Sequence, residues 1–196
     1  MKILLDNGHG IDTPGKRSPD GLLREYAWTR LIASRIVTAL TDLGHDASLL
    51  VPEQEDILLP ERCRRVNSLC RSLGKDNVIL ISIHANAAGR GDCWYDASGW
   101  CAYTTRGDTR ADALATCLYE AARFHLPGQR LCTDYTDGDP DLEADFYLLQ
   151  RTLCPSVLVE NFFMDSRRDY AFLLSPEGQS AIINLHIDGV CRYLAA

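Results

Sequence analysis

Short apolar runs alternate with longer amphipathic stretches along this chain. The runs are rich in β-branched residues and leucine, which favour buried strands, whereas the longer stretches carry apolar residues at helical spacing. The runs that predict strands cover residues 3–6, 46–51, 78–84, 99–104 and 157–160. Strands that alternate with helices are typical of a sheet covered by helices. The pattern therefore predicts an α/β fold with a mostly parallel, twisted sheet of about six strands, flanked by helices on both faces.

Four helices are expected between these strands. They cover residues 22–43, 60–73, 109–125 and 176–194. Gly44 is well placed to end the first helix, and Pro176 suits the first turn of the last one. The acidic segment 134–145 contains proline and glycine, which predicts a loop. We find no repeat, linker or boundary that divides the chain, so we expect one domain over residues 1–196.

Charge and hydropathy exclude several classes of protein. The formal net charge is −7 and the pI is near 5.2, without a clustered basic surface, so we expect no nucleic-acid partner. The N-terminal segment MKILLDNGHG has too short an apolar region for a signal peptide. No later run approaches the roughly 18 apolar residues that a membrane span needs. We therefore expect no transmembrane segment and no export signal in this chain.

The eight cysteines do not form a recognisable metal or disulfide pattern. No CxxC pair occurs, and Cys63 and Cys70 lie seven residues apart on one predicted helix, roughly 10 Å from each other and beyond disulfide reach. Cys93 and Cys101 flank an irregular stretch and could pair. Most of the cysteines are expected to be reduced, partly buried thiols, and none adjoins a motif that would supply a catalytic base.

Three predicted strands end in polar residues that a buried strand does not need. His9 follows the first strand within the motif NGHG, His84 follows ILISI, and Glu160 follows SVLV. The carboxyl ends of parallel strands meet at one edge of a sheet, so residues far apart in sequence converge there. Two imidazoles and a carboxylate are ligands that a catalytic zinc ion uses, with one position open for water. The sequence therefore indicates a zinc site at this edge.

The third zinc ligand must come from elsewhere if Glu160 is the catalytic base. Glu25, near the start of the first long helix, is the best candidate, although a favourable acid in a first helical turn needs no such role. Asp6, Asp12 and Asp20 are rivals. Asp6 is also close enough in sequence to orient His9, as metal-bound imidazoles commonly require.

Five segments, in order, resemble one family of enzymes. They are LDNGHG, the helical stretch from GLLREYAW to GHDASLL, ERCRRVN, ILISIHANA and PSVLVENFFMDSRRDYAFLL. The chain resembles the zinc-dependent N-acetylmuramoyl-L-alanine amidases of the Amidase_3 type over most of its length. The resemblance implies that His9, Glu25 and His84 bind Zn²⁺ and that Glu160 is the catalytic glutamate. It also implies a peptidoglycan or muropeptide substrate, cut between the lactyl group of N-acetylmuramic acid and L-alanine.

The implied chemistry follows from the residue types. A bound zinc ion lowers the pKa of its water to about 7 and polarises the amide carbonyl. Glu160 lies between apolar neighbours, so we expect burial to raise its pKa and to suit it for taking the proton of the water and passing it to the departing amine.

The chain departs from the family pattern in two places. Asn7 stands where members usually have proline, and Val51-Pro52 stands where they usually have an arginine. Neither is a metal or base position. Segments 89–98 and 132–145 match no pattern of the family, and we expect them to shape the substrate groove.

Several further residues have both a functional and a structural interpretation. Asn86 could bind substrate or serve only a turn. The aromatic residues Trp94, Tyr95 and Trp100 could stack on sugar rings, although capping the core is the favoured interpretation. Arg62, with Arg64 and Arg65, is expected on a solvated helix face, even though it falls on a family motif position.

The remaining histidines and acids are assigned no role in catalysis. His45, His125 and His186 are expected only to pack or to face solvent. The acidic run 134–141 invites a calcium hypothesis, but its spacing does not fit the EF-hand loop.

Two other functions compete with the amidase hypothesis. One is a zinc peptidase or amidohydrolase that acts on another substrate, and the other is a catalytically silent wall-binding module. Within the amidase hypothesis, a phage or prophage lysis enzyme that reaches the wall after release and a secreted autolysin whose leader was removed both remain open.

Overall fold

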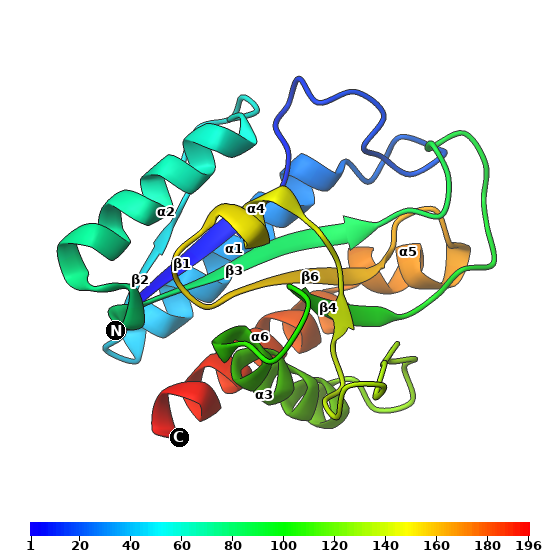
Figure 1. Ribbon diagram of the computed structural model, residues 1–196. Helices are drawn as coiled ribbons and strands as arrows, with labels where there is room; N and C mark the ends of the chain where they lie inside the picture. Colours follow the sequence, from blue (N-terminus) through cyan, green and yellow to red (C-terminus); the bar gives the residue numbers. More distant parts are fainter.

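One six-stranded sheet runs through the protein, and the computed structural model describes all residues 1–196 (Figure 1). The strands are β1 (Lys2–Asn7), β2 (Asp46–Leu49), β3 (Val78–Asn86), β4 (Trp100–Thr104), β5 (Leu142–Glu143) and β6 (Ser156–Phe163). Their order across the sheet is β2-β1-β3-β6-β4-β5, and every neighbouring pair is parallel except β4 with β6. The predicted α/β fold with a mostly parallel sheet is confirmed.

Six helices surround the sheet. They are α1 (Glu25–Asp42), α2 (Leu59–Leu73), α3 (Arg110–His125), α4 (Tyr147–Arg151), α5 (Arg167–Leu174) and α6 (Pro176–Ala195), with a 3₁₀ turn η1 (Lys75–Asn77). The four predicted helices are present within a few residues of the expected bounds. The elements α4, α5 and β5 were not predicted, because five, eight and two residues are too few to show a clear period.

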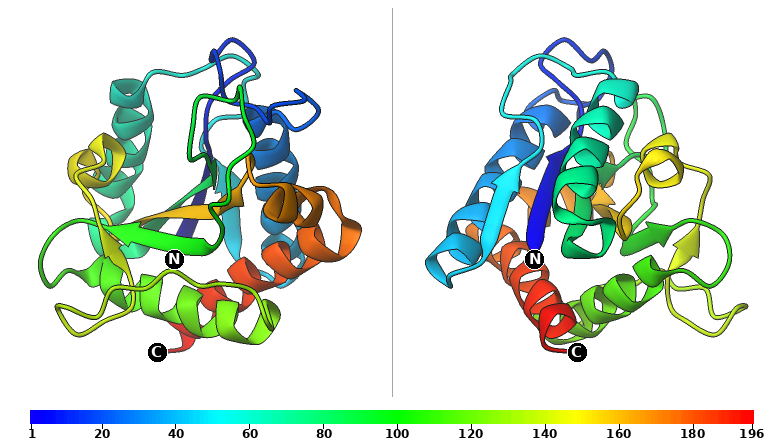
Figure 2. Two further views of the ribbon diagram at one scale, coloured as in Figure 1. Left: turned by 90° about the vertical axis from the view of Figure 1, so that its right-hand side faces the viewer. Right: turned by 60° about the vertical axis from the view of Figure 1, so that its left-hand side comes forward.

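The two faces of the sheet are covered unequally. Figures 1 and 2 show α2 and α4 on one face and α1, α3, α5 and α6 on the other. The four-helix face holds a cluster of 31 buried residues, including Ile81 and Val159. The opposite face holds a cluster of only 10, including Leu80. Successive side chains of a strand point to opposite faces, so β1 and β3 each contribute residues to both clusters.

Two strands continue past the residues at which they were expected to end. We predicted that β3 ends at His84 and β6 at Glu160, but the strands run on to Asn86 and Phe163. The first polar residue marked the wrong boundary, because a strand continues through a polar residue when that side chain faces a pocket. His84 and Glu160 are register partners in adjacent parallel strands, just before a bulge between His84 and Asn86.

Two acidic side chains fix the loop that follows β3. Asp165 accepts hydrogen bonds from the backbone N–H groups of Ala88 and Gly89, at 3.0 and 2.8 Å. Asp169 accepts from the Ser98 hydroxyl and the Gly99 N–H, at 2.6 and 3.0 Å. Both carboxylates are buried, so this loop is fastened to the segment that follows β6.

All eight cysteines are unpaired in the structure. Cys93 is exposed whereas Cys101 is buried in β4, so the two residues considered as a disulfide pair lie in different environments. None of the helices combines the length and the apolar character that crossing a bilayer requires.

Candidate active site

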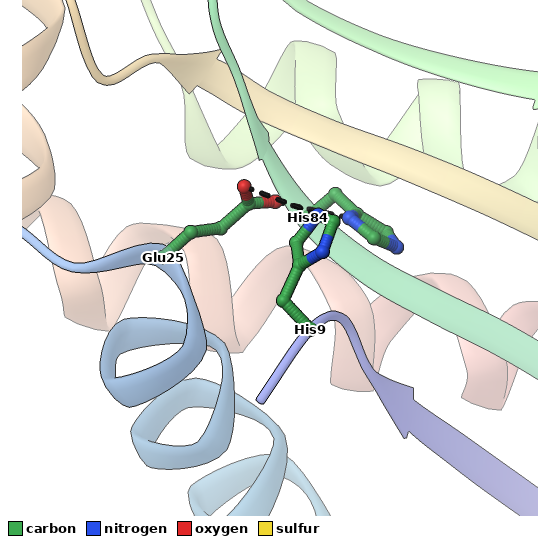
Figure 3. Close-up of side chains that lie close together, drawn as sticks. All are labelled: His9, Glu25 and His84. Carbon is green, nitrogen blue, oxygen red and sulfur yellow. Dashed lines mark hydrogen bonds and ion pairs between the residues drawn. The ribbon is translucent and has the colours of Figure 1, made fainter. Parts of the chain in front are cut away.

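His9, Glu25 and His84 meet at the carboxyl end of the parallel strands (Figure 3). His9 follows β1, Glu25 is the first residue of α1, and His84 lies in β3. Glu25 Oε1 is 2.9 Å from His84 Nδ1, and Glu25 Oε2 is 3.3 Å from His9 Nε2. One donor atom from each residue lies within 4.8 Å of the other two, so the three side chains form one cluster.

The turn that carries His9 is held from α1. His9 has a left-handed backbone with φ of 64°, which is uncommon for a residue other than glycine. Thr29 Oγ1 donates to the carbonyl of Gly8 at 3.0 Å, and Arg30 Nη1 donates to the carbonyl of His9 at 2.9 Å. A Cβ at Gly8 would lie 2.2 Å from the His84 ring, so only glycine fits there. Thr29 and Arg30 are positioning residues that the sequence did not reveal.

Burial and mutual attraction set the charges of the cluster. Burial lowers the pKa of His9 to about 4, so this imidazole is neutral at pH 7. Burial opposes charge on Glu25 and His84 as well, but their hydrogen bond and the attraction between opposite charges together outweigh it, which lowers the pKa of Glu25 and raises that of His84. Glu25 Oε2 is buried without a hydrogen-bond partner. Two imidazoles and a carboxylate with an unsatisfied oxygen fit a divalent metal ion.

Glu160 lies beside this cluster on the same face of the sheet. It pairs in register with His84 across β3 and β6 and lines the same pocket. Burial raises its pKa to about 7, against the effect of neighbouring His84. Its Oε2 atom is buried and accepts no hydrogen bond. A carboxyl group with this pKa can both accept and donate a proton near neutral pH.

The pocket that contains these residues has a volume of about 460 Å³ and two unlike walls. His9, His84 and Glu160 lie on the polar side. The apolar side comprises residues before and within α2 and around α4, among them Leu58, Leu59, Phe146 and Tyr147. Lys16 also lines the pocket and contributes positive charge near Glu160. The sequence did not single out these five residues, since an exposed leucine or lysine in a loop carries no pattern.

A larger pocket of about 650 Å³ lies away from this cluster. Its lining includes Lys75, Arg110 and Ser156, which is the first residue of β6. It contains none of the residues singled out as catalytic or metal-binding.

The solvated position predicted for Arg62 is wrong. Its side chain is buried and forms ion pairs with Asp6 at 2.6 Å and Asp56 at 2.9 Å. The second oxygen of Asp6 accepts from the Ser82 hydroxyl at 2.5 Å. Asp6 is therefore engaged by Arg62 and Ser82 and does not orient His9. An arginine next to exposed Arg64 in a helix resembles a solvated residue until its buried partners are known.

The two departures from the family pattern meet in space. Asn7 Nδ2 donates to the carbonyl of Val51 at 3.0 Å, and both residues are fully buried. Asn7 thus joins the end of β1 to the segment after β2. Such a bond needs a side-chain donor, which proline does not have.

The rival metal ligands are engaged elsewhere. Asp12 accepts from the backbone N–H of Asp56 at 2.7 Å, and Asp20 accepts from the Ser18 hydroxyl at 2.6 Å. Asn86 lies at the end of β3, where its Oδ1 accepts from the Ala87 N–H at 2.8 Å, and it is not among the residues that line the pocket. Its substrate-binding role stays a prediction.

The three aromatic residues considered for sugar stacking have different surroundings. Trp100 is fully buried, packs against Tyr119 at 4.9 Å between ring centroids, and donates to Asn161, so it belongs to the core. Trp94 contacts Tyr170 at 5.1 Å between ring centroids, and Tyr95 is 41% exposed. Neither Trp94 nor Tyr95 lines the pocket of the cluster.

The chain matches known proteins over nearly its whole length. The model of the N-acetylmuramoyl-L-alanine amidase family Amidase_3 matches residues 3–192. The chain is 29% identical to the N-acetylmuramoyl-L-alanine amidase CwlM of Bacillus licheniformis, over 98% of this chain and 68% of that protein. It is 27% identical to the sporulation-specific N-acetylmuramoyl-L-alanine amidase of Bacillus subtilis, over 97% of this chain and 67% of that protein.

Solved structures share the fold. The N-acetylmuramoyl-L-alanine amidase AmiC2 of Nostoc punctiforme aligns with a TM-score of 0.81 and 26% identity, covering 100% of this chain and 98% of that chain. An N-acetylmuramoyl-L-alanine amidase of Clostridium difficile 630 aligns with a TM-score of 0.80 and 22% identity, covering 100% and 97%. The chain therefore belongs to the Amidase_3 family of N-acetylmuramoyl-L-alanine amidases, metal-dependent enzymes that act on the peptidoglycan of the cell wall.

Proposed function

We propose that residues 1–196 form one catalytic domain in which His9, Glu25 and His84 hold a zinc ion and Glu160 is the general acid/base. The bond hydrolysed joins the lactyl group of N-acetylmuramic acid to L-alanine. The observation that carries this proposal is the register pairing of His84 with Glu160, which places the carboxyl group beside the three-residue cluster and within the same pocket.

The donor set favours zinc among divalent ions. Two imidazoles and one carboxylate, with space left for a further ligand, are common at catalytic zinc sites, whereas Mg²⁺ and Ca²⁺ prefer oxygen ligands alone. When bound here, zinc supplies a Lewis acid that activates water and polarises an amide carbonyl. The neutral state of His9 at pH 7 leaves its imidazole able to act as a ligand.

Glu160 performs the proton transfers in this proposal. As a carboxylate it accepts a proton from the attacking water, and as a carboxylic acid it donates that proton to the nitrogen of the departing L-alanine. Its pKa of about 7 makes both states accessible near neutral pH. The buried apolar residues Leu148 and Leu158 that line the pocket limit its hydration, and Lys16 favours the carboxylate form.

Product analysis tests which bond is cut. Purified cell walls would be digested with the zinc-loaded protein, and both new N-terminal residues and new reducing sugar ends would be measured. We expect N-terminal L-alanine to appear without new reducing ends. Release of any other N-terminal residue would instead support a peptidase with the same metal chemistry.

Metal analysis tests the ligand set. We expect His9→Ala, Glu25→Ala and His84→Ala each to lose bound zinc and wall hydrolysis. The control is His125→Ala, because His125 pairs with Asp188 away from the cluster. Full zinc content and activity in any one of the three variants would remove that residue from the proposed ligand set.

A further inference from the structure

Three aspartates form a cluster outside the proposed active site. Asp112 lies in the first turn of α3. Asp139 lies in the loop before β5, and Asp141 immediately precedes β5. One carboxylate oxygen from each residue lies within 4.8 Å of the other two. Two of the three come from segment 132–145, whose sequence does not match the family pattern.

Asp141 is the buried centre of this cluster, and one of its oxygens is unsatisfied. The residue is 2% exposed. Its Oδ2 atom accepts a hydrogen bond of 2.6 Å from the Thr104 hydroxyl at the end of β4. Its Oδ1 atom is buried and has no hydrogen-bond partner. A buried carboxylate oxygen without a partner is costly, and a bound cation is one way to satisfy it.

No basic side chain of the protein compensates these charges. None of the three aspartates forms an ion pair with lysine, arginine or histidine. Asp112 caps α3 together with Thr109, so the helix N-terminus stabilises that carboxylate. Asp139 and Asp141 do not lie at a helix N-terminus. Burial, together with neighbouring Asp139, raises the pKa of Asp141 above its ordinary value.

We propose that Asp112, Asp139 and Asp141 bind a calcium ion. The donors are oxygen atoms only, with no histidine or cysteine, which selects a hard cation over zinc. Ca²⁺ accepts irregular coordination more readily than Mg²⁺, which demands a near-ideal octahedron.

The ion would fasten the loop to two regular elements at once. Asp112 belongs to α3, and Asp141 is bonded to Thr104 of β4, which pairs with Glu143 of β5. The chain then reaches Phe146, which packs against Tyr103 at 5.2 Å between ring centroids and lines the catalytic pocket. Calcium binding would thus stabilise the segment that leads into the apolar wall of the pocket.

Equilibrium dialysis of the zinc-loaded protein against calcium chloride alone tests the site. We expect one calcium ion per chain in addition to zinc, with a Kd of about 0.1–1 mM, as in extracellular calcium modules. Calcium at ten times the Kd should raise the Tm by about 3–6 °C. Magnesium chloride should bind at least tenfold more weakly. Absence of calcium binding at 10 mM, or equal binding of magnesium, would overturn the proposal.

Variants place the ion within the cluster. Asp141→Asn should lose calcium binding and the rise in Tm, and partly exposed Asp139→Asn should weaken binding at least tenfold even if Asp141→Asn does not fold. The matched control is Asp137→Asn, an exposed aspartate of the same loop outside the cluster, which should bind within twofold of the parent. Calcium binding by Asp139→Asn equal to that of the parent would refute the assignment. His9→Ala should retain calcium, which separates this site from the zinc cluster.

Discussion

The two faces of the central sheet use the same strands for opposite purposes. On the four-helix face, side chains such as Ile83 and Val159 are fully buried in a continuous apolar cluster. On the other face, their neighbours His84 and Glu160 line an open pocket that residues of α2 and α4 also line. One step along a strand thus separates packing from chemistry, because successive side chains point in opposite directions.

The unequal covering explains how the protein can tolerate polar groups in its central strands. The larger cluster supplies most of the apolar burial, so the smaller cluster can leave space above the ends of β3 and β6. The polar residues of the open face are held by specific partners instead, such as the Asp6–Arg62 ion pair.

Glu160→Gln should separate chemistry from structure on the open face. Loss of the general acid/base should lower the rate of wall hydrolysis by roughly 10²- to 10⁴-fold while zinc stays bound. The measurements are kcat with a soluble muropeptide and zinc content by mass spectrometry. Glu177→Gln, at the exposed start of α6, is the control. Near-parental activity of Glu160→Gln would assign the proton transfers to another residue.

Arg62→Ala should show that the open face depends on a buried ion pair. Removal of the guanidinium leaves Asp6 buried without its charged partner, so the free energy of unfolding should fall by about 3–5 kcal/mol. Urea denaturation measures this change. Arg64→Ala provides the comparison, because Arg64 forms only an exposed pair with Glu61 and should change stability by less than about 1 kcal/mol. Equal effects of the two changes would contradict the buried role of Arg62.

Ile81→Ala should affect only the packed face. The side chain is fully buried, so its truncation should lower the free energy of unfolding by about 2–5 kcal/mol. Under conditions where the variant remains folded, we expect kcat within twofold of the parent, because Ile81 points away from the pocket. Leu22→Ala, at a site that is 76% exposed, serves as the stability control. A large loss of kcat in folded Ile81→Ala would show that the faces are coupled.

The buried Glu160 carboxyl group should make stability depend on pH in the metal-free protein. Its folded pKa of about 7 lies above its usual value of about 4.5, so the folded state retains a proton that the unfolded state releases. The free energy of unfolding should therefore fall as pH rises from about 4.5 to 7, by about 3 kcal/mol in total. Urea denaturation of chelator-treated parent and Glu160→Gln at both ends of this range isolates the effect. Parallel pH profiles for the two proteins would mean that burial does not raise this pKa.

Leu58→Ala should have the smallest effect and should act on substrate binding alone. Leu58 lines the pocket and is 75% exposed, so its removal should change stability by less than about 0.5 kcal/mol. If substrate covers it, KM should rise by about threefold to tenfold with little change in kcat. Phe124→Ala removes a similarly exposed apolar side chain outside the pocket and should leave KM unchanged.

The long central strands and the main helices could be predicted because their patterns are strong. An apolar run such as 78–83 is consistent with a strand buried on both faces, and the spacing in α1 matches the helical period. The short elements α4 and β5 could not be predicted in this way, because their positions depend on contacts with the rest of the fold. Their absence from the prediction also hid Phe146 and Tyr147 as parts of the pocket wall.

The polar residues show the same limit. His9, His84 and Glu160 were recognisable because each interrupts or follows an apolar strand, and the structure brings them together with Glu25. Arg62 and Asn161 were not recognised, because a single arginine on a helix or asparagine in a strand carries no period. Asn161 lies between His84 and Trp100. Its side chain donates to the carbonyl of His84 at 3.0 Å and accepts from the indole N–H of Trp100 at 3.1 Å. Such contacts become visible only in three dimensions.

The pairing of His84 with Glu160 also ties the active site to a single alignment of two strands. A slip of one residue would turn Glu160 into the packed cluster and set Val159 or Asn161 opposite His84. Such a misaligned chain would contain every residue of the site in the correct order and would still be inert. Wall hydrolysis is thus a sensitive reporter of correct strand pairing when the unfolded protein is refolded.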